Sequence, residues 1–332
     1  MTSKRQGLLD AIAAQISDYQ QGFGEPRTPK RIDDWVKQFD KSVQEPILAE
    51  MVHVLERQYI SKQTFENRLR SMVRASKLLK LTPLELWQRA NFLWIQKKGS
   101  SQAVMRKLFA AALKAETGLD IDKCGSPDGP YFYLDDGVFT ATHVRWDLVD
   151  WVKSDAPEKA VVYVVVMAIH DGRIDYTSRE VAKQAHARGK DIRVGGWWAA
   201  VRIPEQEGLG VETAVLKPRS FPDGDPHVAQ LLNALKDHPP RPRRVLTTSK
   251  NPVFSSEEAR ALLEQEFLKA GARIKYELCK QLPANAWPLG YDVFKGPGFG
   301  SMLVTYRNCP NNCPLALWAG DPWIPLFPRR SN

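Results

Sequence analysis

The chain has 332 residues, of which 43% are hydrophobic and 26% are charged. This apolar content excludes a disordered chain, and glycines without a three-residue period exclude a collagen-like one. The formal charge of +9 favours acidic partners, of which phosphates are the commonest. The length predicts either one compact unit with an accessory region or two domains.

The first 90 residues carry a helical pattern. Apolar residues recur at helical spacing in LLDAIAAQI, RIDDWVKQF and PILAEMVHVLERQY. Asp10 interrupts the short apolar stretch near the start, so we expect no signal peptide and a cytoplasmic protein. Residues 1–90 are therefore predicted to form a helical N-terminal region, of winged-helix, helix-turn-helix or docking type.

A basic helix lies in the later part of this region. Ser61 can cap the helix SKQTFENRLRSMVRASKLL, in which Arg70, Arg74 and Lys77 share one face because they stand at i, i+4 and i+7. Residues 1–100 contain 17 Lys and Arg against 11 Asp and Glu, so they carry +6 of the total +9. We interpret this face as a candidate surface for nucleic acid or a protein partner. The alternative is a solvated face of a helix that packs on the core.

Strand-like and helical stretches alternate after residue 90, which predicts an α/β domain over 91–332 with a parallel-type sheet flanked by helices. The apolar run AVVYVVVMAI is too short to cross a bilayer and indicates a buried strand, so no membrane contact is expected. The predicted strands are 91–96, 131–134, 161–169 and 192–203, and the predicted helices are 102–116, 143–153 and 177–188, the last closed by Gly189.

The segment 216–253 is rich in proline and basic residues, and we expect a long loop broken by one short helix near 227–236. A serine then caps the strongly helical SSEEARALLEQEFLKAG, which is predicted to end at Gly271. The tail from Pro288 is rich in Gly, Pro and aromatic residues and indicates a structural closing segment. The alternative is that its PNN loop at 310–312 faces the functional site.

The segment YFYLDDGVFTATHVRWD places two carboxylates directly after a predicted strand, with a loop expected at 135–142 and then a helix. Ligands of open α/β sheets bind at this edge. Asp135 and Asp136 can accept hydrogen bonds from vicinal sugar hydroxyls, while Thr140, Thr142 and the helix N-terminus can bind a phosphate. The pattern predicts a sugar phosphate site, and an ordinary turn with a helix cap is the alternative.

A second loop with anion-binding character lies between a predicted strand and a predicted helix. Lys97, Lys98, Gly99 and Ser100 are basic, flexible or hydroxyl-bearing, so this loop can hold a pyrophosphate. The alternative is that the lysines are solvated and a serine only caps the helix.

Metal-binding patterns are weak in this sequence. Cys309 and Cys313 have CxxxC spacing, but Cys124 and Cys279 lie far away, which favours buried thiols over a zinc site. His170 ends a predicted strand at the sheet edge of the acidic pair, where it can cap a turn or touch a ligand. Mg²⁺ would come with a pyrophosphorylated ligand and not with a protein cage.

The segment LDDGVFTATH resembles the loop of type I phosphoribosyltransferases that binds 5-phosphoribosyl 1-pyrophosphate (PRPP). That loop has two acidic residues, three variable residues and then Thr-Gly-x-Thr. By position, the two aspartates match the acidic pair that contacts the ribose hydroxyls, and Thr140 matches the first threonine. Ala141 stands where Gly is usual and His143 where Thr or Ser is usual, so that Thr142 would supply the second hydroxyl.

Over roughly residues 31–330 the chain resembles the divergent phosphoribosyltransferase-like proteins of bacterial conflict and anti-phage systems, including those that accompany retrons. The stretches that carry this resemblance are RIDDWVKQF, FLWIQKKGSSQ, YLDDGVFTATHVRWDLVDWV, EEARALLEQEFLKAGARI and the ending GFGSMLVTYRNCPNNCPLALWAGDPWIPLFPRR. The resemblance implies an effector that binds PRPP or a nucleotide with Mg²⁺ and acts at the ribose anomeric carbon. The alternative is a nucleotide-binding or regulatory protein without turnover, which docks a reverse transcriptase and its RNA–DNA complex through the basic N-terminal helices.

Overall fold

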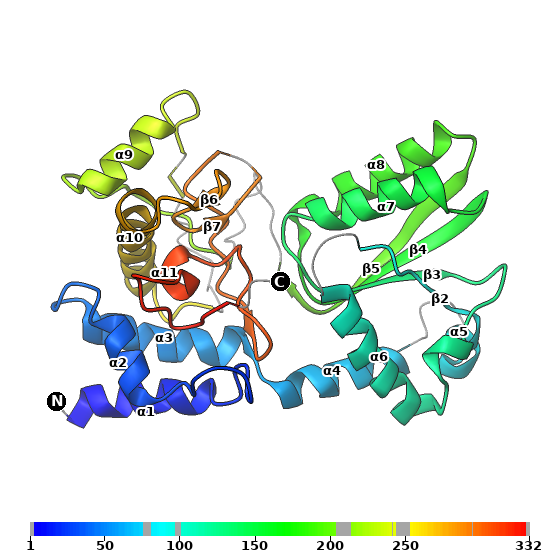
Figure 1. The fold of residues 1–332 in the computed structure, drawn as a ribbon, viewed down its shortest axis with the longest axis horizontal. Helices are drawn as coiled ribbons and strands as arrows, with labels where there is room; N and C mark the ends of the chain where they lie inside the picture. Colours follow the sequence, from blue (N-terminus) through cyan, green and yellow to red (C-terminus); the bar gives the residue numbers. More distant parts are fainter. Residues whose placement is uncertain are drawn as a thin grey trace. The chain divides into compact units, whose positions relative to one another are not determined.

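The computed structural model describes residues 3–75, 81–96, 101–203, 214–240, 242–243, 253–293 and 295–329. The chain forms two compact units (Figure 1). The first, named here the sheet unit, comprises Gln63–Glu205. The second, named the two-segment unit, combines Met1–Lys62 with Gln206–Ser331.

The sheet unit is built on four parallel strands in the order β2-β3-β4-β5. The alternation of strands and helices in the sequence explains this, because each connecting helix returns the chain to the same edge of the sheet. The predicted α/β class, with a parallel sheet flanked by helices, is therefore confirmed. The strands are β2 (Asn91–Phe92), β3 (Tyr131–Val138), β4 (Lys159–His170) and β5 (Asp191–Ile203). The helices are α4 (Lys62–Arg74), α5 (Pro83–Arg89), α6 (Ser101–Thr117), α7 (Thr142–Ser154) and α8 (Ile174–His186), with short turns η2 (Ile121–Lys123) and η3 (Asp171–Arg173).

Helices cover both faces of this sheet, α7 and α8 on one face and α5 and α6 on the other (Figure 1). Successive strand residues point to opposite faces, so neighbours on β3 enter different apolar layers. Tyr133 packs in the layer of α7 and α8 with Leu148 and Val181. Phe132 packs against Trp87 of α5, with ring centroids 4.9 Å apart. These two layers hold β3, which carries the acidic pair, firmly in the sheet.

β3 is longer than predicted. Its parallel register with β4 continues as far as Val138, which lies opposite Ile169. Asp135 and Asp136 are therefore part of the strand, and the loop expected at 135–142 begins only after the strand ends. The reason is that the backbone of β4, an unbroken apolar strand, continues to offer hydrogen bonds beyond the point where the polar residues begin.

The two-segment unit contains the helices α1 (Ser3–Gln15), α2 (Pro29–Val36), α3 (Gln44–Gln58), α9 (Pro226–Ala234), α10 (Glu257–Arg273) and α11 (Leu315–Trp318), and the π-helical turn η4 (Ile274–Leu278). Its strands form two small pairs, a parallel one of β1 (Tyr59–Ile60) with β8 (Val304–Thr305) and an antiparallel one of β6 (Ala286–Trp287) with β7 (Gly290–Tyr291). The expected short helix in 216–253 is α9.

One hydrophobic core joins the two segments of this unit. It includes side chains from α1–α3 and side chains from Leu216 to Phe327. Fully buried Trp35 of α2 donates a hydrogen bond from its indole N–H to the Ala316 carbonyl oxygen at 2.8 Å. The structure does not divide the chain at the predicted residue 90. Helices α1–α3 share a core with the C-terminal segment, whereas α4 and α5 pack in the sheet unit.

Further element boundaries differ from the predictions, and α8 begins three residues before the predicted start at 177. The strand predicted over 91–96 is reduced to Asn91–Phe92. α10 continues past Gly271 and ends at Arg273. A Cβ atom on Gly271 would lie 2.3 Å from the Pro288 carbonyl oxygen, so this glycine permits close packing of the tail against the helix and does not end it.

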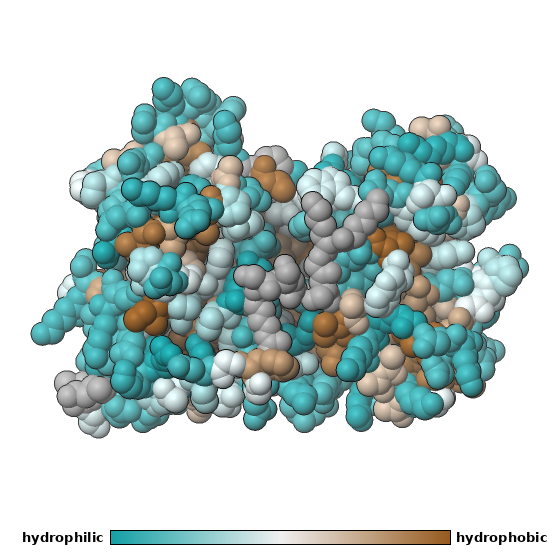
Figure 2. Space-filling view, in the orientation of Figure 1, coloured by the Kyte–Doolittle hydropathy of each residue, from teal (hydrophilic) through white to brown (hydrophobic). Residues whose placement is uncertain are grey.

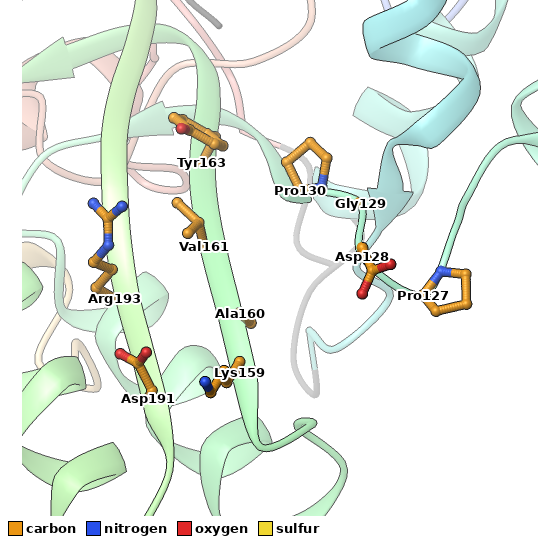
Figure 3. A pocket seen from close by; sticks show the side chains of 10 residues that line it. All are labelled: Pro127, Asp128, Gly129, Pro130, Lys159, Ala160, Val161, Tyr163, Asp191 and Arg193. Carbon is orange, nitrogen blue, oxygen red and sulfur yellow. The ribbon is translucent and has the colours of Figure 1, made fainter.

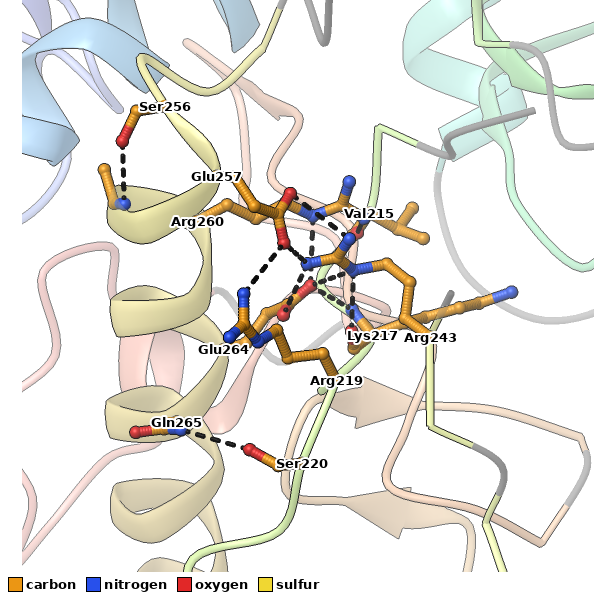
Figure 4. Close-up of polar contacts among 11 residues, drawn as sticks. Val215, Lys217, Arg219, Ser220, Arg243, Ser256, Glu257, Arg260, Glu264 and Gln265 are labelled. Atoms are coloured by element: carbon orange, nitrogen blue, oxygen red, sulfur yellow. Dashed lines mark hydrogen bonds and ion pairs between the residues drawn. The ribbon is translucent and has the colours of Figure 1, made fainter. Parts of the chain in front are cut away.

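A buried ionic network holds the start of the second segment on α10 (Figure 4). Fully buried Glu264 accepts hydrogen bonds from Arg243 Nε at 2.9 Å and from Arg260 Nε at 3.0 Å. Arg243 Nη2 also donates to Glu257 at 2.6 Å, and Arg260 Nη2 donates to the Val215 carbonyl oxygen at 2.8 Å. Burial raises the pKa of Glu264, and the two guanidiniums oppose that rise. Removal of one partner from such a network typically costs about 3–5 kcal/mol, because a buried charge is left behind.

The C-terminal tail packs into the core of the two-segment unit. The Asn312 side chain donates to the Tyr291 carbonyl oxygen at 2.8 Å. Gly290, with a φ of 105°, lets the backbone of Asn312 approach to a distance that a Cβ would not permit. Cys309 and Cys313 are buried, and all four cysteines are free thiols. In the part of the chain that the structure describes, no group of three or more His, Cys, Asp or Glu side chains is arranged to hold a metal.

Hydrophobic side chains on the face shown in Figure 2 occur in small groups among hydrophilic ones. Over the described ranges, none of the helices has both the length and the apolar character needed to cross a membrane.

Candidate functional site

The acidic pair lies near the carboxyl end of β3, where Asp135 stands opposite Val166 of β4. Asp135 is 6% exposed, Asp136 is half-buried, and Oδ1 of Asp135 accepts a hydrogen bond from the Asp136 backbone N–H at 2.8 Å. Burial raises the pKa of Asp135 to about 8, and the charge of Asp136 adds to the rise, while a hydrogen bond with the Ser101 hydroxyl opposes it. Burial and the neighbouring charge therefore both favour the protonated form of Asp135.

Two glutamines hold Ser101 in place for this contact. The Gln96 side chain accepts a hydrogen bond from the Gln102 backbone N–H at 2.9 Å and donates one to the Ser101 hydroxyl oxygen at 2.8 Å. The Gln102 side-chain oxygen accepts hydrogen bonds from the backbone N–H groups of Ile95 and Gln96, both at 2.9 Å. These bonds join residues 95–96, which follow β2, to residues 101–102 at the start of α6. They thereby fix the position of Ser101 beside Asp135.

The predicted pyrophosphate loop lies within this connection. Lys97, Lys98, Gly99 and Ser100 fall outside the described residues, so their role stays a prediction. Ser101, the residue that follows them, contacts the acidic pair, and the sequence interpretation missed it because a serine at a helix start also fits a cap. Nothing in the spacing of the two glutamines signals their reciprocal hydrogen bonds.

The loop between β3 and α7 holds Ala141 in the left-handed conformation, with φ 54° and ψ 8°. Glycine adopts this conformation without strain, so Ala141 has the backbone shape that suits the Gly of the Thr-Gly-x-Thr pattern. Ala141 is the N-cap residue of α7, and its methyl group gives the first-turn N–H groups no side-chain cap. Helix N-termini are a common binding site for anions. Thr140 is half-buried, and the hydroxyl of buried Thr142 donates to the Thr140 carbonyl oxygen at 3.4 Å.

Two histidines lie near this edge of the sheet. His143 is exposed, and its ring is 5.6 Å from that of Trp146 in an edge-to-face arrangement. His170, the last residue of β4, is buried, and its ring lies 5.3 Å from that of Phe139. The His170 side chain does not cap the η3 turn that follows it.

The basic face predicted on α4 is directed toward a carboxylate of α6. Arg74 Nη1 lies 2.9 Å and Arg70 Nη1 4.0 Å from the Glu116 carboxylate oxygens. The arginine side chains remain 59% and 51% exposed, respectively. Two guanidiniums share one carboxylate, so this face keeps a net positive charge. Lys77 lies outside the described residues, and a partner for the face stays a prediction.

An open pocket of about 430 Å³ lies at the opposite edge of the sheet (Figure 3). Lys159 and Asp191, the first residues of β4 and β5, line it together with Arg193. Lys159 stands seven residues before Val166, the partner of Asp135, or about 23 Å at the usual rise of a strand. Tyr163, which also lines the pocket, stands three residues before Val166, or about 10 Å, and neither aspartate is among the lining residues. The pocket is therefore separate from the acidic pair.

A family model described as PRTase-CE matches residues 32–329, that is, all but the first 31 and the last three residues. No curated protein and no solved structure matches the chain.

Proposed function

We propose that this chain, which belongs to the PRTase-CE family and is phosphoribosyltransferase-like, binds PRPP or a nucleotide at the carboxyl edge of β3. The observation that carries the proposal is the left-handed backbone of Ala141, between the acidic pair and the first turn of α7. A positive φ is uncommon outside glycine and strains the backbone, so its presence at the phosphate position of the loop pattern points to a functional constraint.

The neighbouring groups suit each part of a ribose 5-phosphate. Asp135 and Asp136 accept hydrogen bonds from the vicinal ribose hydroxyls, and protonated Asp135 can also donate one. Thr140, Thr142 and the first-turn N–H groups of α7 hold the 5′-phosphate. The loop at 97–100 takes the pyrophosphate.

The proposed reaction is a displacement at the ribose anomeric carbon, C1. The bond from C1 to pyrophosphate or to a base breaks, and the electron pair leaves with that group. Water or the nitrogen of an incoming base forms the new bond to C1 and loses its proton to the solvent or to the leaving group. Positive charge develops on the ribose beside the acidic pair. Catalysis would then rest on positioning and on stabilisation of this charge.

Mg²⁺ is the proposed cofactor. The described residues offer no cage of three ligating side chains, but the half-buried carboxylate of Asp136 is an oxygen ligand of the kind that Mg²⁺ prefers. Asp136 and the phosphate oxygens of the ligand would hold the ion, which would neutralise charge on the pyrophosphate.

Calorimetric titration with PRPP and with nucleotides, in the presence of Mg²⁺, tests the binding. We expect the wild type to bind, and the double variant Asp135→Asn/Asp136→Asn to bind at least 10-fold more weakly. The loss comes mainly from the carboxylate of Asp136, because a hydrogen bond to a charged group contributes about 1.5–3 kcal/mol. Chromatography of the incubated ligands then tests turnover through release of pyrophosphate or base. The proposal fails if the wild type binds none of these compounds.

We also propose that the protein is an effector of a bacterial anti-phage system, of retron type, and that it works in the cytoplasm. The resemblance of its sequence stretches to proteins of such systems supports this role, and four free thiols agree with a reducing compartment. Plaque counts on cells that carry the gene with its neighbours provide the test. The double variant should abolish protection, and protection that survives it would contradict an effector role for the site.

A second candidate function is nucleotide binding without turnover, with a reverse transcriptase and its RNA–DNA product docked on the basic helices. The methyl group of Ala141 at the phosphate position and the exposed Arg70 and Arg74 favour it. Binding without product release in the chromatographic assay would support this function. Nucleic-acid affinity should then fall steeply with salt, and Arg70→Ala/Arg74→Ala should lower the slope of log K against log [salt] by about 1–2.

A further inference from the structure

Two arginines of the two-segment unit have no carboxylate partner in the part of the chain that the structure describes. Arg27 lies between α1 and α2, and Arg329 lies near the end of the tail. The backbone carbonyl oxygen of Glu25 accepts hydrogen bonds from Nε of Arg27 at 3.1 Å and from its Nη2, while the Glu25 carboxylate pairs with Arg31. The Arg329 guanidinium lies 5.0 Å from the centre of the Trp318 ring, and its buried Nε has no acceptor among the described residues.

One buried hydroxyl places both guanidiniums in the same neighbourhood. Tyr19 is 5% exposed, and its hydroxyl donates at 2.9 Å to the carbonyl oxygen of Pro328, the residue before Arg329. The same hydroxyl oxygen accepts a hydrogen bond from the Cys309 backbone N–H at 3.2 Å. Burial raises the pKa of Tyr19, and the charges of Arg27 and Arg329 both oppose this rise. Both guanidiniums therefore lie close enough to Tyr19 to act on one hydroxyl.

A strained residue fastens the segment that follows α1 to the tail. Gln20 has a φ of 49°, a left-handed conformation that is uncommon outside glycine. Its backbone N–H donates to the Tyr306 carbonyl oxygen at 2.7 Å, and its side chain donates to the Pro328 carbonyl oxygen at 3.2 Å and to Asn308 Oδ1 at 3.5 Å. Backbone strain of this kind gathers at ligand sites. The segments that carry the two arginines are thus held together by the fold itself.

The protein removes water from this cationic pair without supplying a counter-charge. Burial lowers the pKa of Arg27, and partly buried arginines are normally paired. The carboxylate of Asp18, just before Tyr19, is engaged elsewhere, because it accepts hydrogen bonds from the Tyr59 hydroxyl and the Lys62 backbone N–H, both at 2.6 Å. An anion from outside the chain would supply the missing charge.

We propose that Arg27 and Arg329 bind a phosphate monoester. A phosphate monoester carries a charge of about −2 at neutral pH, which matches two guanidiniums, whereas a carboxylate or a phosphodiester carries only one charge. The forked N–H groups of arginine also suit the oxygens of a phosphate. The site lies in the two-segment unit, so it does not rest on the proposed function of the sheet unit.

Chemical modification of the wild type locates the site. Phenylglyoxal reacts with accessible arginine side chains, and mass spectrometry of the resulting peptides shows which of them have reacted. We expect inorganic phosphate and AMP, at saturation, to slow the modification of Arg27 and Arg329 several-fold. Arg57, which is exposed and pairs with Glu56 in the same unit, is the matched control and should react at an unchanged rate. Equal protection by acetate, or by an oligothymidylate that carries no terminal phosphate, would overturn the proposal.

Calorimetric titration with inorganic phosphate then measures the contribution of each arginine. Arg27→Gln and Arg329→Gln should each weaken the binding of one phosphate per chain by about 10-fold or more, because hydrogen bonds to charged groups are the strong ones. Arg329→Lys should lose less, since it keeps the charge and loses only the fork, and Arg57→Gln should bind like the wild type.

Urea unfolding shows whether each variant is folded. A folded double variant Arg27→Gln/Arg329→Gln that binds phosphate as the wild type does would overturn the proposal, as would a wild type in which phosphate protects neither arginine. The double variant should still bind PRPP as tightly as the wild type, because that ligand is assigned to the sheet unit. Protection of both arginines in a protein that binds no PRPP supports the phosphate site and removes only the proposed function.

Discussion

Replacement of Asp135 by asparagine should stabilise the protein without ligand, and the gain should grow with pH. The pKa of this carboxyl rises from 3.8 to about 8 on folding, first because of burial and then because of the charge on Asp136. The folded state therefore keeps the proton over a pH range in which the unfolded state has lost it. It follows that the free energy of unfolding falls as the pH rises from about 4 to about 8.

The size of the effect follows from the shift. One pKa unit corresponds to about 1.4 kcal/mol, so ionisation of the unfolded carboxyl costs the folded protein roughly 1–2 kcal/mol at pH 5 and on the order of 5 kcal/mol at pH 8. Asparagine has the same shape without the charge, and its oxygen still accepts the Asp136 N–H. The gain of Asp135→Asn should therefore be several kcal/mol larger at pH 8 than at pH 5.

Urea unfolding at the two pH values measures this difference. The exposed carboxylate of Asp128 is the matched control, and Asp128→Asn should give the same small change at both pH values. Ser101→Ala removes a hydrogen bond that favours the ionised form of Asp135, so it should extend the loss of stability above pH 8. A gain for Asp135→Asn that is equal at both pH values, or larger at pH 5, would refute the reasoning.

Three further substitutions test the packing by urea unfolding. Ala141→Gly should be nearly neutral, because relief of about 1 kcal/mol of left-handed strain offsets the entropy gained by the unfolded chain. The control Ala111→Gly, inside α6, should lower the free energy of unfolding by about 1 kcal/mol. Equal costs for the two substitutions would contradict the strain at Ala141. Arg243→Ala should cost about 3–5 kcal/mol and the more exposed Arg219→Ala less than about 1 kcal/mol, and a loss that is equal for both would argue against the buried network. Trp35→Phe loses the buried hydrogen bond to the second segment, while Trp323 Nε1 still donates to the same carbonyl oxygen at 3.0 Å. It should therefore cost only about 0.5–1.5 kcal/mol, and no loss would contradict a contribution of this bond to stability.

Local sequence pattern is sufficient to predict much of the sheet unit. The apolar run of β4 and the helical spacing after His143 predict a strand and a helix because burial and periodicity act over a few neighbouring residues. Gly189 has a φ of 72° after α8, in keeping with its predicted position beyond the helix end. The end of β3 is missed because paired aspartates usually indicate a turn, whereas here the neighbouring strand keeps them in the sheet.

The two-segment unit is not predictable in this way. Trp35 and Ala316 are 281 residues apart, and neither neighbourhood shows that one will be the partner of the other. The same limit applies to the candidate site. Its acidic pair and phosphate loop are continuous in sequence and can be recognised, but the contact of Ser101 with Asp135 depends on two connections meeting at one sheet edge.

The shared core of the two segments has a consequence for synthesis on the ribosome. Helices α1–α3 emerge before the sheet unit, yet the residues that cover their apolar faces extend to Phe327. At about 5–20 residues per second, translation of the intervening chain takes on the order of tens of seconds. During that time Gln63–Glu205 can complete its own core, while the first helices wait with exposed apolar surface, a state that chaperones recognise. Nascent chains stalled before the last segment should therefore be protease-sensitive at both α1 and α3.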